Sequence, residues 1–324
     1  MQDLLIKSEI TAEQLVSGIV SIMTTCFGDR ILSIYLTGSM NREQLTLSSD
    51  IDMTVVFRGT ISDAEQNQYM QLQDGLQMLS PLRLDVWAES EAKIRDRPAN
   101  KATRSSTCLY GEDFFPELTS QPIEHFAMRY VHKSIHYMRV LRGRPEPNPA
   151  PFTYPQAGEE FFGYTQFADF AGAEKFTSGI RIIMNMLTTC LTARLAHEKN
   201  IEVTTKQDSL EQYAQQFDDE WGNYSRQLVD LIKLELQYQL PSQAEQKQKL
   251  QSLLRRLPDF ENFMLNHFKP IILANLQSDN KRRRKLALVA LMNVQFNDAA
   301  IASELASITQ IDDTELLETV KRLN

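Results

Sequence analysis

The chain has 324 residues, enough for two domains of ordinary size. Hydrophobic residues make up 42% and charged residues 23%, which excludes a disordered or fibrous protein. The net charge is -8, from 34 Lys and Arg against 42 Asp and Glu, so a protein whose whole surface binds nucleic acid is excluded, because such surfaces neutralise phosphates with many cations.

The cysteines and the apolar runs indicate the cellular compartment. Cys26, Cys108 and Cys190 are far apart and form no C-x-x-C pair, so we expect neither a disulfide framework nor a zinc knuckle. The first residues lack the apolar region of a signal peptide, and the run 286–292 is far shorter than the roughly 20 residues that span a bilayer. We therefore expect a cytoplasmic protein without membrane contact.

Helices and strands alternate in the N-terminal part of the sequence. Thr11 followed by Gln14 has capping-box spacing and predicts a helix that ends near Gly28. Ser62 followed by Glu65 predicts a second helix in the same way. Three β-type runs, which predict strands, lie at 31–36, 50–57 and 82–87.

Helical periodicity replaces these β-type runs from residue 122 onward, and four prolines at 145–151 interrupt it with an extended connector. The expected helices lie at 124–142, 173–197, 206–217, 221–240, 242–268, 298–305 and 312–323. We predict an α+β protein, with a mixed sheet and helices at 1–117, an all-α helical bundle at 118–277 and a helical C-terminal extension at 278–324.

Carboxylates mark two of the predicted strands. Asp50 and Asp52 lie at positions i and i+2 of a strand and so share one face, where they repel unless a cation lies between them. If the strand 82–87 pairs beside them, Asp85 completes a cluster of three acids. Oxygen ligands of this kind suit Mg²⁺. Three carboxylates could hold two metal ions, or hold one ion and supply a general base.

A small turn follows the strand 31–36. Glycine at Gly38 lets the backbone approach a phosphate, and the Ser39 hydroxyl and neighbouring N–H groups can donate to its oxygens. Gly38-Ser39, ten further residues, Asp50-Ile-Asp52 and a later Asp85 resemble the nucleotidyltransferase superfamily, which includes DNA polymerase beta and the aminoglycoside nucleotidyltransferases.

This resemblance implies a role for each matched residue. Gly38 and Ser39 would bind the β and γ phosphates of a nucleoside triphosphate, Asp50 and Asp52 would ligate Mg²⁺, and Asp85 would ligate a second Mg²⁺ or deprotonate the acceptor hydroxyl. ATP is the expected co-substrate. The first domain would then be a mixed sheet of the nucleotidyltransferase type.

A second resemblance extends into the helical part. The segment Leu109-Tyr-Gly-Glu112 is similar to the L-x-G-E segment of streptomycin/spectinomycin-type adenylyltransferases, which implies an acceptor or base role for Glu112. A long helix followed by Lys206 is similar to their helical domain, where a lysine faces the nucleotide phosphates. There are two departures: Asp113 replaces a tryptophan, and Glu43 replaces a second glycine of the phosphate loop.

Two basic features have simpler interpretations. His132 and His136 are four residues apart on a helix but have no Glu beside His132 and no evident third ligand, so ordinary helix-face histidines are favoured over zinc. The basic run from Lys281 to Lys285 leaves a local nucleic-acid contact open, although a solvated helix start is commoner.

We predict a Mg²⁺-dependent nucleotidyltransferase that moves AMP from ATP to a hydroxyl of a small molecule and releases pyrophosphate. The acidity favours a cationic acceptor such as an aminoglycoside over RNA. Two alternatives stay open. One is the same chemistry on a protein, an RNA end or a nucleotide. The other is a nucleotide-binding or partner-binding protein with little turnover, in which Glu43 impairs the loop.

Overall fold

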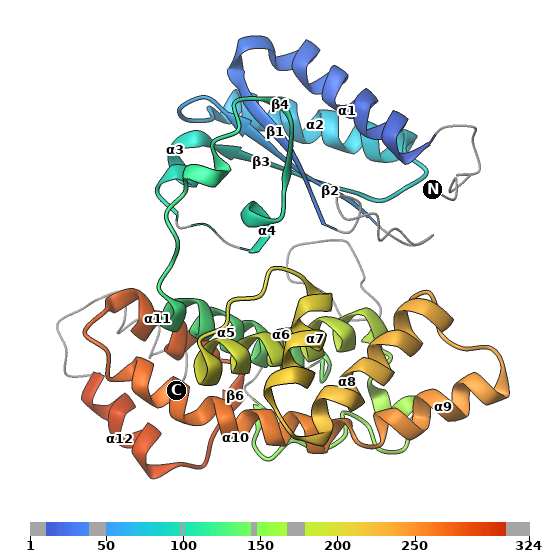
Figure 1. Ribbon diagram of the computed structural model, residues 1–324, viewed down its shortest axis with the longest axis vertical. Helices are drawn as coiled ribbons and strands as arrows, with labels where there is room; N and C mark the ends of the chain where they lie inside the picture. The colour runs from blue at the N-terminus through green and yellow to red at the C-terminus, as the bar shows by residue number, and fades with distance from the viewer. Residues whose placement is uncertain are drawn as a thin grey trace. The chain divides into compact units, whose positions relative to one another are not determined.

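The chain folds into two units, Met1–Gln121 and Pro122–Asn324, each with its own hydrophobic core (Figure 1). The computed structural model describes residues 11–38, 50–97, 99, 101–143, 148–166 and 179–308. The first unit is a sheet with helices and the second is built from helices. The predicted α+β class is confirmed.

A mixed sheet of four strands forms the centre of the first unit. Its strands lie in the order β3-β2-β1-β4. Strand β1 is antiparallel to β2 and β4, and β2 is parallel to β3. The strands are β1 (Ile31–Thr37), β2 (Ile51–Phe57), β3 (Leu84–Ser90) and β4 (Thr107–Gly111). The first two match the predicted β-type runs, β3 overlaps the run predicted at 82–87, and β4 was not predicted.

Two helices, α1 (Ala12–Phe27) and α2 (Asp63–Leu79), cover one face of this sheet (Figure 1). Both begin at the predicted capping boxes, with Thr11 and Ser62 as the N-cap residues. Every second residue of the strands points into this layer, so the apolar set is buried. The core between helices and sheet includes Ile19, Met23, Tyr69, Ile34, Met53, Val55, Leu84 and Val86.

The opposite face of the sheet is divided along the strands. At one end, the short helix α3 (Glu91–Arg95) and the 3-10 turn Phe115–Glu117 contribute side chains to a small aromatic core. In that core, Tyr35 stacks on Phe115 with ring centroids 3.6 Å apart. At the other end, where β1 finishes and β2 begins, the face carries aspartates instead of an apolar core.

The second unit is built around α5 (Ile123–Val140), α6 (Gly179–Lys199) and α10 (Leu257–Leu276), whose apolar sides share one core. The other α-helices among the described residues are α7 (Lys206–Gln216), α8 (Glu220–Asp230), α9 (Ala244–Leu254), α11 (Lys281–Leu291) and α12 (Ala299–Ile308). In the segment expected to form an extension, α11 packs against α5 and α10.

The expected helix at 242–268 is instead two helices, α9 and α10. Pro258 lies in the first turn of α10, where its missing N–H and fixed φ favour a helix start. The expected helix at 173–197 is described only from Gly179 onward, and that at 312–323 lies outside the described residues.

A buried ion pair crosses the core of the second unit. The Arg142 guanidinium donates to Glu261 Oε1 at 2.8 Å and to Oε2 at 2.6 Å, and the Tyr164 hydroxyl donates to Oε2 at 2.8 Å. Side-chain exposure is 5% for Arg142 and 0% for Glu261. The carboxylate is therefore removed from water with its charge balanced and both oxygens hydrogen-bonded, which is the condition for a tolerable buried pair.

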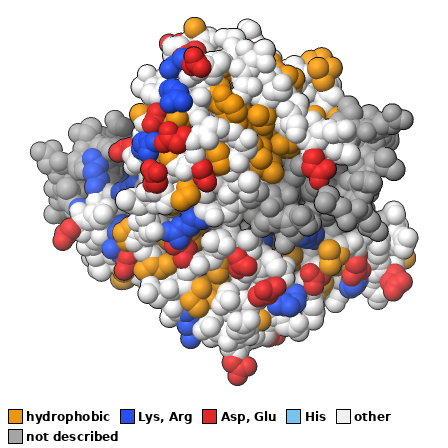
Figure 2. All heavy atoms as spheres, turned by 45° about the horizontal axis from the view of Figure 1, so that its top comes forward, with side chains coloured by type: hydrophobic (Ala, Val, Ile, Leu, Met, Phe, Trp, Pro, Cys, Tyr) orange, Lys and Arg blue, Asp and Glu red, His pale blue; other side chains and the backbone are white. Residues whose placement is uncertain are grey.

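None of the helices within the described residues is both long and apolar enough to cross a membrane. On the face in Figure 2, acidic and basic side chains lie among each other and do not form one continuous basic surface. This agrees with the excess of acids in the composition.

Candidate active site

Strand pairing brings three aspartates together at the start of β2. Asp52 lies opposite Thr37 on β1 and opposite Asp85 on β3. The Ile51 N–H donates to the carbonyl of Arg83 at 2.9 Å, which extends the β2–β3 register to the end that carries Asp50. The predicted juxtaposition of Asp50, Asp52 and Asp85 is present in the fold.

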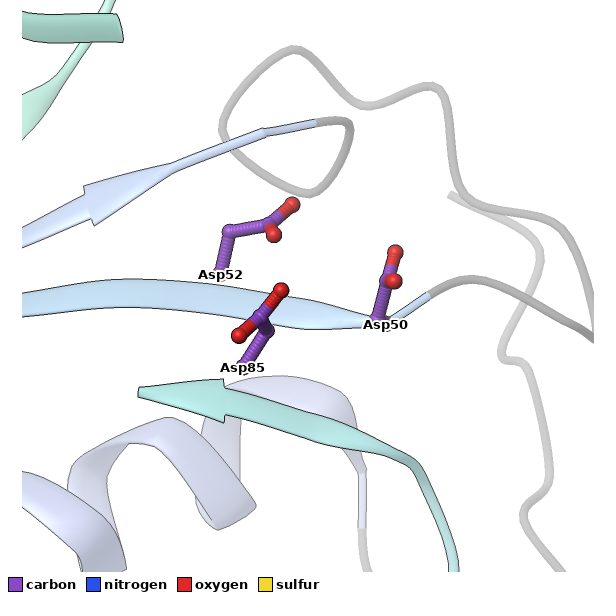
Figure 3. Close-up of side chains that lie close together, drawn as sticks. All are labelled: Asp50, Asp52 and Asp85. Atoms are coloured by element: carbon purple, nitrogen blue, oxygen red, sulfur yellow. The ribbon is translucent and has the colours of Figure 1, made fainter. Parts of the chain in front are cut away.

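The three carboxylates converge on one small volume (Figure 3). One oxygen from each of Asp50, Asp52 and Asp85 lies within 4.8 Å of the other two, and all three residues are half-buried. Three like charges so close together repel, and a divalent cation among them reverses the sign of that interaction. Hard oxygen donors at this spacing fit Mg²⁺. Among the described residues this is the one group of three side chains that could hold a metal ion.

Gly38 is needed next to this cluster for a steric reason. Its φ of +73° lies in the left-handed region that favours glycine. A Cβ on Gly38 would also collide with Asp52 Oδ2 and lie 2.7 Å from Asp52 Cγ. The Thr37 hydroxyl donates to the Asp52 carbonyl at 3.3 Å and so ties the end of β1 to β2. Ser39 and Glu43 lie outside the described residues.

Tyr69 of α2 holds β3 from the other side of the sheet. Its hydroxyl donates to the carbonyl of Val86 at 2.7 Å inside the core. Burial raises the pKa of Tyr69, and the negative charge of Asp85 raises it further. The phenol therefore stays protonated and remains a donor to the strand that carries Asp85. Sequence reasoning missed Tyr69 and Thr37, because neither belongs to a motif.

Glu112 lies away from the three aspartates. It follows β4, and Gly111 pairs with Ser33 near the start of β1, whereas Asp52 pairs with Thr37 at the end of β1. Four strand residues separate these points by about 13 Å. The Glu112 carboxylate accepts a hydrogen bond from Arg95 at 3.2 Å. The structure does not bring Glu112 to the acidic cluster, and its acceptor role stays a prediction.

Lys206 begins α7 in the second unit. Thr205 caps this helix in a capping box with Asp208, and Lys206 Nζ donates to Asn185 Oδ1 on α6 at 2.7 Å. Nucleotide binding by Lys206 stays a prediction.

The basic run begins α11, and two of its arginines bind their own surroundings. Arg283 Nε donates to Asn275 Oδ1 at 2.8 Å, and Arg284 donates to the carbonyl of Asp279 at 3.4 Å. Asn280 caps the helix. These contacts fit the interpretation as a helix start. A nucleic-acid contact at Lys281 and Lys285 stays a prediction.

His132 and His136 face each other along α5 with ring centroids 6.4 Å apart. Burial, followed by the charges of His136, Lys133 and Arg129, lowers the pKa of His132 to about 4. Within the part of the chain that the structure describes, no third side chain completes a metal site with these two histidines. Ordinary helix-face histidines stay the prediction for this pair.

A family model for the nucleotidyltransferase domain of polymerase beta matches residues 21–114. This range contains Gly38 and all three aspartates of the cluster. The N-terminal unit therefore contains a domain of the nucleotidyltransferase type. The resemblance drawn from the sequence motifs is thereby confirmed for the N-terminal unit, and the match ends at Phe114, just after β4.

No curated protein matches the sequence of this chain. One solved structure with which it aligns is spectinomycin adenyltransferase AAD(9) from Enterococcus faecialis, determined with ATP and spectinomycin. The two sequences are 12% identical, and the alignment covers 76% of this chain and 98% of that chain with a TM-score of 0.45.

Proposed function

We propose that this nucleotidyltransferase moves AMP from ATP to a hydroxyl group of a small molecule and releases pyrophosphate. The observation that carries the proposal is the cluster of Asp50, Asp52 and Asp85 inside a nucleotidyltransferase domain. These residues would hold Mg²⁺, with two ions as the expected number. When bound, Mg²⁺ would neutralise charge on the attacking and leaving oxygens.

The remaining parts of the site would bind and orient the nucleotide. The backbone at Gly38 can approach a phosphate closely, and the Ser39 hydroxyl and the Lys206 ammonium would add donors to the phosphate oxygens. The acceptor oxygen forms a bond to the α-phosphorus, and the bond from that phosphorus to the oxygen bridging to the β-phosphate breaks. Pyrophosphate leaves with the bonding electron pair.

Asp85 is our candidate for the group that receives the acceptor's proton. It lies beside Asp52 in the β2–β3 register, at the edge of the cluster away from Gly38. Its second candidate role is metal ligation. An Asp85→Asn variant distinguishes the two, because loss of a base lowers kcat alone, whereas loss of a ligand also raises the Mg²⁺ concentration needed for half-maximal rate.

The acceptor class follows from charge. The net charge of -8 favours a cationic acceptor such as an aminoglycoside over a polyanion. A contact from Glu112 to this acceptor remains part of the proposal, and a nucleic-acid acceptor is disfavoured.

The direct test measures pyrophosphate release from ATP and Mg²⁺ with a panel of aminoglycosides, and separately with no acceptor. We expect release with at least one acceptor, an acceptor product heavier by one AMP, and no release by Asp52→Asn. If no member of the panel supports release, the aminoglycoside-like acceptor is wrong. Oligonucleotides or adenylylated protein in the sample without acceptor would instead identify a nucleotide or a protein side chain as the acceptor.

A further inference from the structure

An exposed tryptophan lies beside the acidic cluster. The chain has two tryptophans, Trp87 and Trp221. Trp221 is 7% exposed and belongs to the core of the helical unit, whereas Trp87 on β3 is 65% exposed. An indole in water leaves a large apolar surface uncovered, and tryptophans with one face open are enriched at binding surfaces.

The alternation of residues along β3 shows which face of the sheet carries Trp87. Leu84 and Val86 are buried in the core under α2, so Asp85 and Trp87 point to the opposite face. Their Cα atoms are about 6.6 Å apart along the strand. In the β2–β3 register, Asp85 lies opposite Asp52, and Trp87 lies opposite Thr54. The indole therefore occupies the row next to the carboxylates on the same face of the sheet.

The strand order assigns Trp87 to one side of the reacting centre. Gly38, the candidate phosphate contact, packs against Asp52 from β1. Trp87 lies on β3, which is the edge of the sheet on the other side of β2. Asp85, the candidate proton acceptor, belongs to that same strand. A group lying on Trp87 thus approaches the cluster from the side opposite the phosphates.

Beyond Trp87, β3 carries charges that are already balanced. Glu89 is two residues further along the same face and accepts from Arg97 at 3.0 Å, and Lys93 lies 3.5 Å from it. Between this ion-paired patch and the three carboxylates, the indole is the apolar part of the strand's face. A ligand that reaches Asp85 along this face of β3 therefore lies next to Trp87.

We propose that the Trp87 face of β3 is the acceptor subsite and takes a saturated, hydroxylated ring that carries an amino group. The inference rests on the proposed function and adds to it the residue that binds the ring of the acceptor. The indole face attracts C–H groups and a cation. The ring would then present a hydroxyl toward Asp85.

The two tryptophans provide a direct measurement. In a Trp221→Phe background, the fluorescence comes from Trp87 alone, and quenching by acrylamide reports how exposed the indole is. The probes are spectinomycin and kanamycin, added with and without ATP and Mg²⁺. We expect the probe that supports pyrophosphate release to reduce the quenching constant at least twofold. ATP with Mg²⁺ and no aminoglycoside should leave it unchanged.

Kinetics supply the second readout. We expect Trp87→Ala to raise KM for that aminoglycoside at least tenfold while KM for ATP changes less than twofold, and Trp87→Phe to recover part of the loss. Met78→Ala is the matched control, because Met78 on α2 is 88% exposed and away from this face. It should leave both constants unchanged, and circular dichroism should show every variant folded.

The outcomes separate this inference from the proposed function. If the wild-type protein releases no pyrophosphate with any aminoglycoside, the proposed acceptor class fails and the subsite fails with it. If the wild type is active but Trp87→Ala keeps its acceptor KM, the subsite alone is wrong. Protection of Trp87 by ATP and Mg²⁺ alone would also overturn it, because the indole would then stack on the nucleobase.

Discussion

Carboxylates are used in opposite ways in the two units of this chain. In the helical unit, Glu261 is completely buried and its charge is balanced by Arg142, with Tyr164 as a further donor. In the sheet unit, three aspartates of like charge share one half-buried site, with oxygens within 4.8 Å of one another. In the first arrangement the counter-charge offsets the loss of hydration, whereas in the second the like charges repel one another.

The aspartate cluster lowers the stability of the metal-free fold, and the Glu261 pair does not. Asp50, Asp52 and Asp85 repel one another until a cation binds, so their grouping is explained by ligand binding and not by folding. Glu261 has no such role, and its loss of hydration is offset only while Arg142 is present. Variants of the cluster should therefore change enzymatic activity, whereas variants of the Glu261 pair should change the free energy of unfolding.

The largest effect should come from the cluster. We expect Asp52→Asn to lower kcat/KM about a thousandfold, on the order of 4 kcal/mol, because it removes a metal ligand beside the reacting phosphate. The free energy of unfolding without metal should stay the same or rise, since one of three repelling charges is gone. Pyrophosphate release and urea denaturation measure the two quantities.

Asp74→Asn is the control for this prediction, because Asp74 is exposed on α2 and outside the cluster. It should change neither activity nor stability. If Asp52→Asn instead lost more than about 1 kcal/mol of stability, the cluster would stabilise the fold as the Glu261 pair does.

In the helical unit, loss of one partner of the buried ion pair should lower the stability of the fold. Arg142→Met should lower the free energy of unfolding by about 3 to 4 kcal/mol, because Glu261 then stays buried without its counter-charge. The double variant Arg142→Met with Glu261→Leu should recover most of this loss. Lys247→Met is the matched control, since its pair with Glu160 is exposed and contributes at most about 1 kcal/mol.

The sequence predicted the acidic site well because its signals are local. The β-type runs set Asp50, Asp52 and Asp85 on strand faces, and i, i+2 alternation gave the correct face for each. The two capping boxes predicted the starts of α1 and α2 because those hydrogen bonds join residues three apart. Only the pairing of β2 with β3 had to be assumed.

What the sequence could not predict depends on contacts between distant segments. Strand β4 is an edge strand with little burial and no apolar alternation, so nothing in Thr107–Gly111 indicated a strand. Its antiparallel pairing with β1 carries Glu112 to the end away from the aspartates. Likewise, the alternation in 82–87 places Trp87 opposite the core, but only the fold shows that it remains uncovered.

A smaller effect on stability is expected at His132, whose neighbours are positively charged, whereas the three aspartates are negatively charged. His132 lies near Arg129, Lys133 and His136 on α5, and burial together with these charges lowers its pKa to about 4 from 6.5. Between these pH values the unfolded chain binds a proton that folded His132 does not. The free energy of unfolding should therefore fall as the pH drops from 6.5 to 4.

We expect His132 to account for about 2 kcal/mol of that fall. Urea denaturation at several pH values measures it, and His132→Gln should flatten the curve in this window while leaving stability at pH 8 nearly unchanged. An equally steep curve in the variant would mean that His132 is not the group responsible. The loss of stability between pH 6.5 and 4 would then come from other titrating groups.

The smallest effect tests how the sheet supports its cluster. Tyr69→Phe removes the donor to the buried carbonyl of Val86 and should lower the free energy of unfolding by about 1 kcal/mol. Because that bond holds the strand carrying Asp85, kcat should also fall severalfold while KM for ATP stays within twofold. Tyr154→Phe removes a more exposed bond to the carbonyl of Arg255 in the helical unit and should leave kcat unchanged. If both variants lost the same activity, Tyr69 would act through general stability, and the position of β3 would not depend on it.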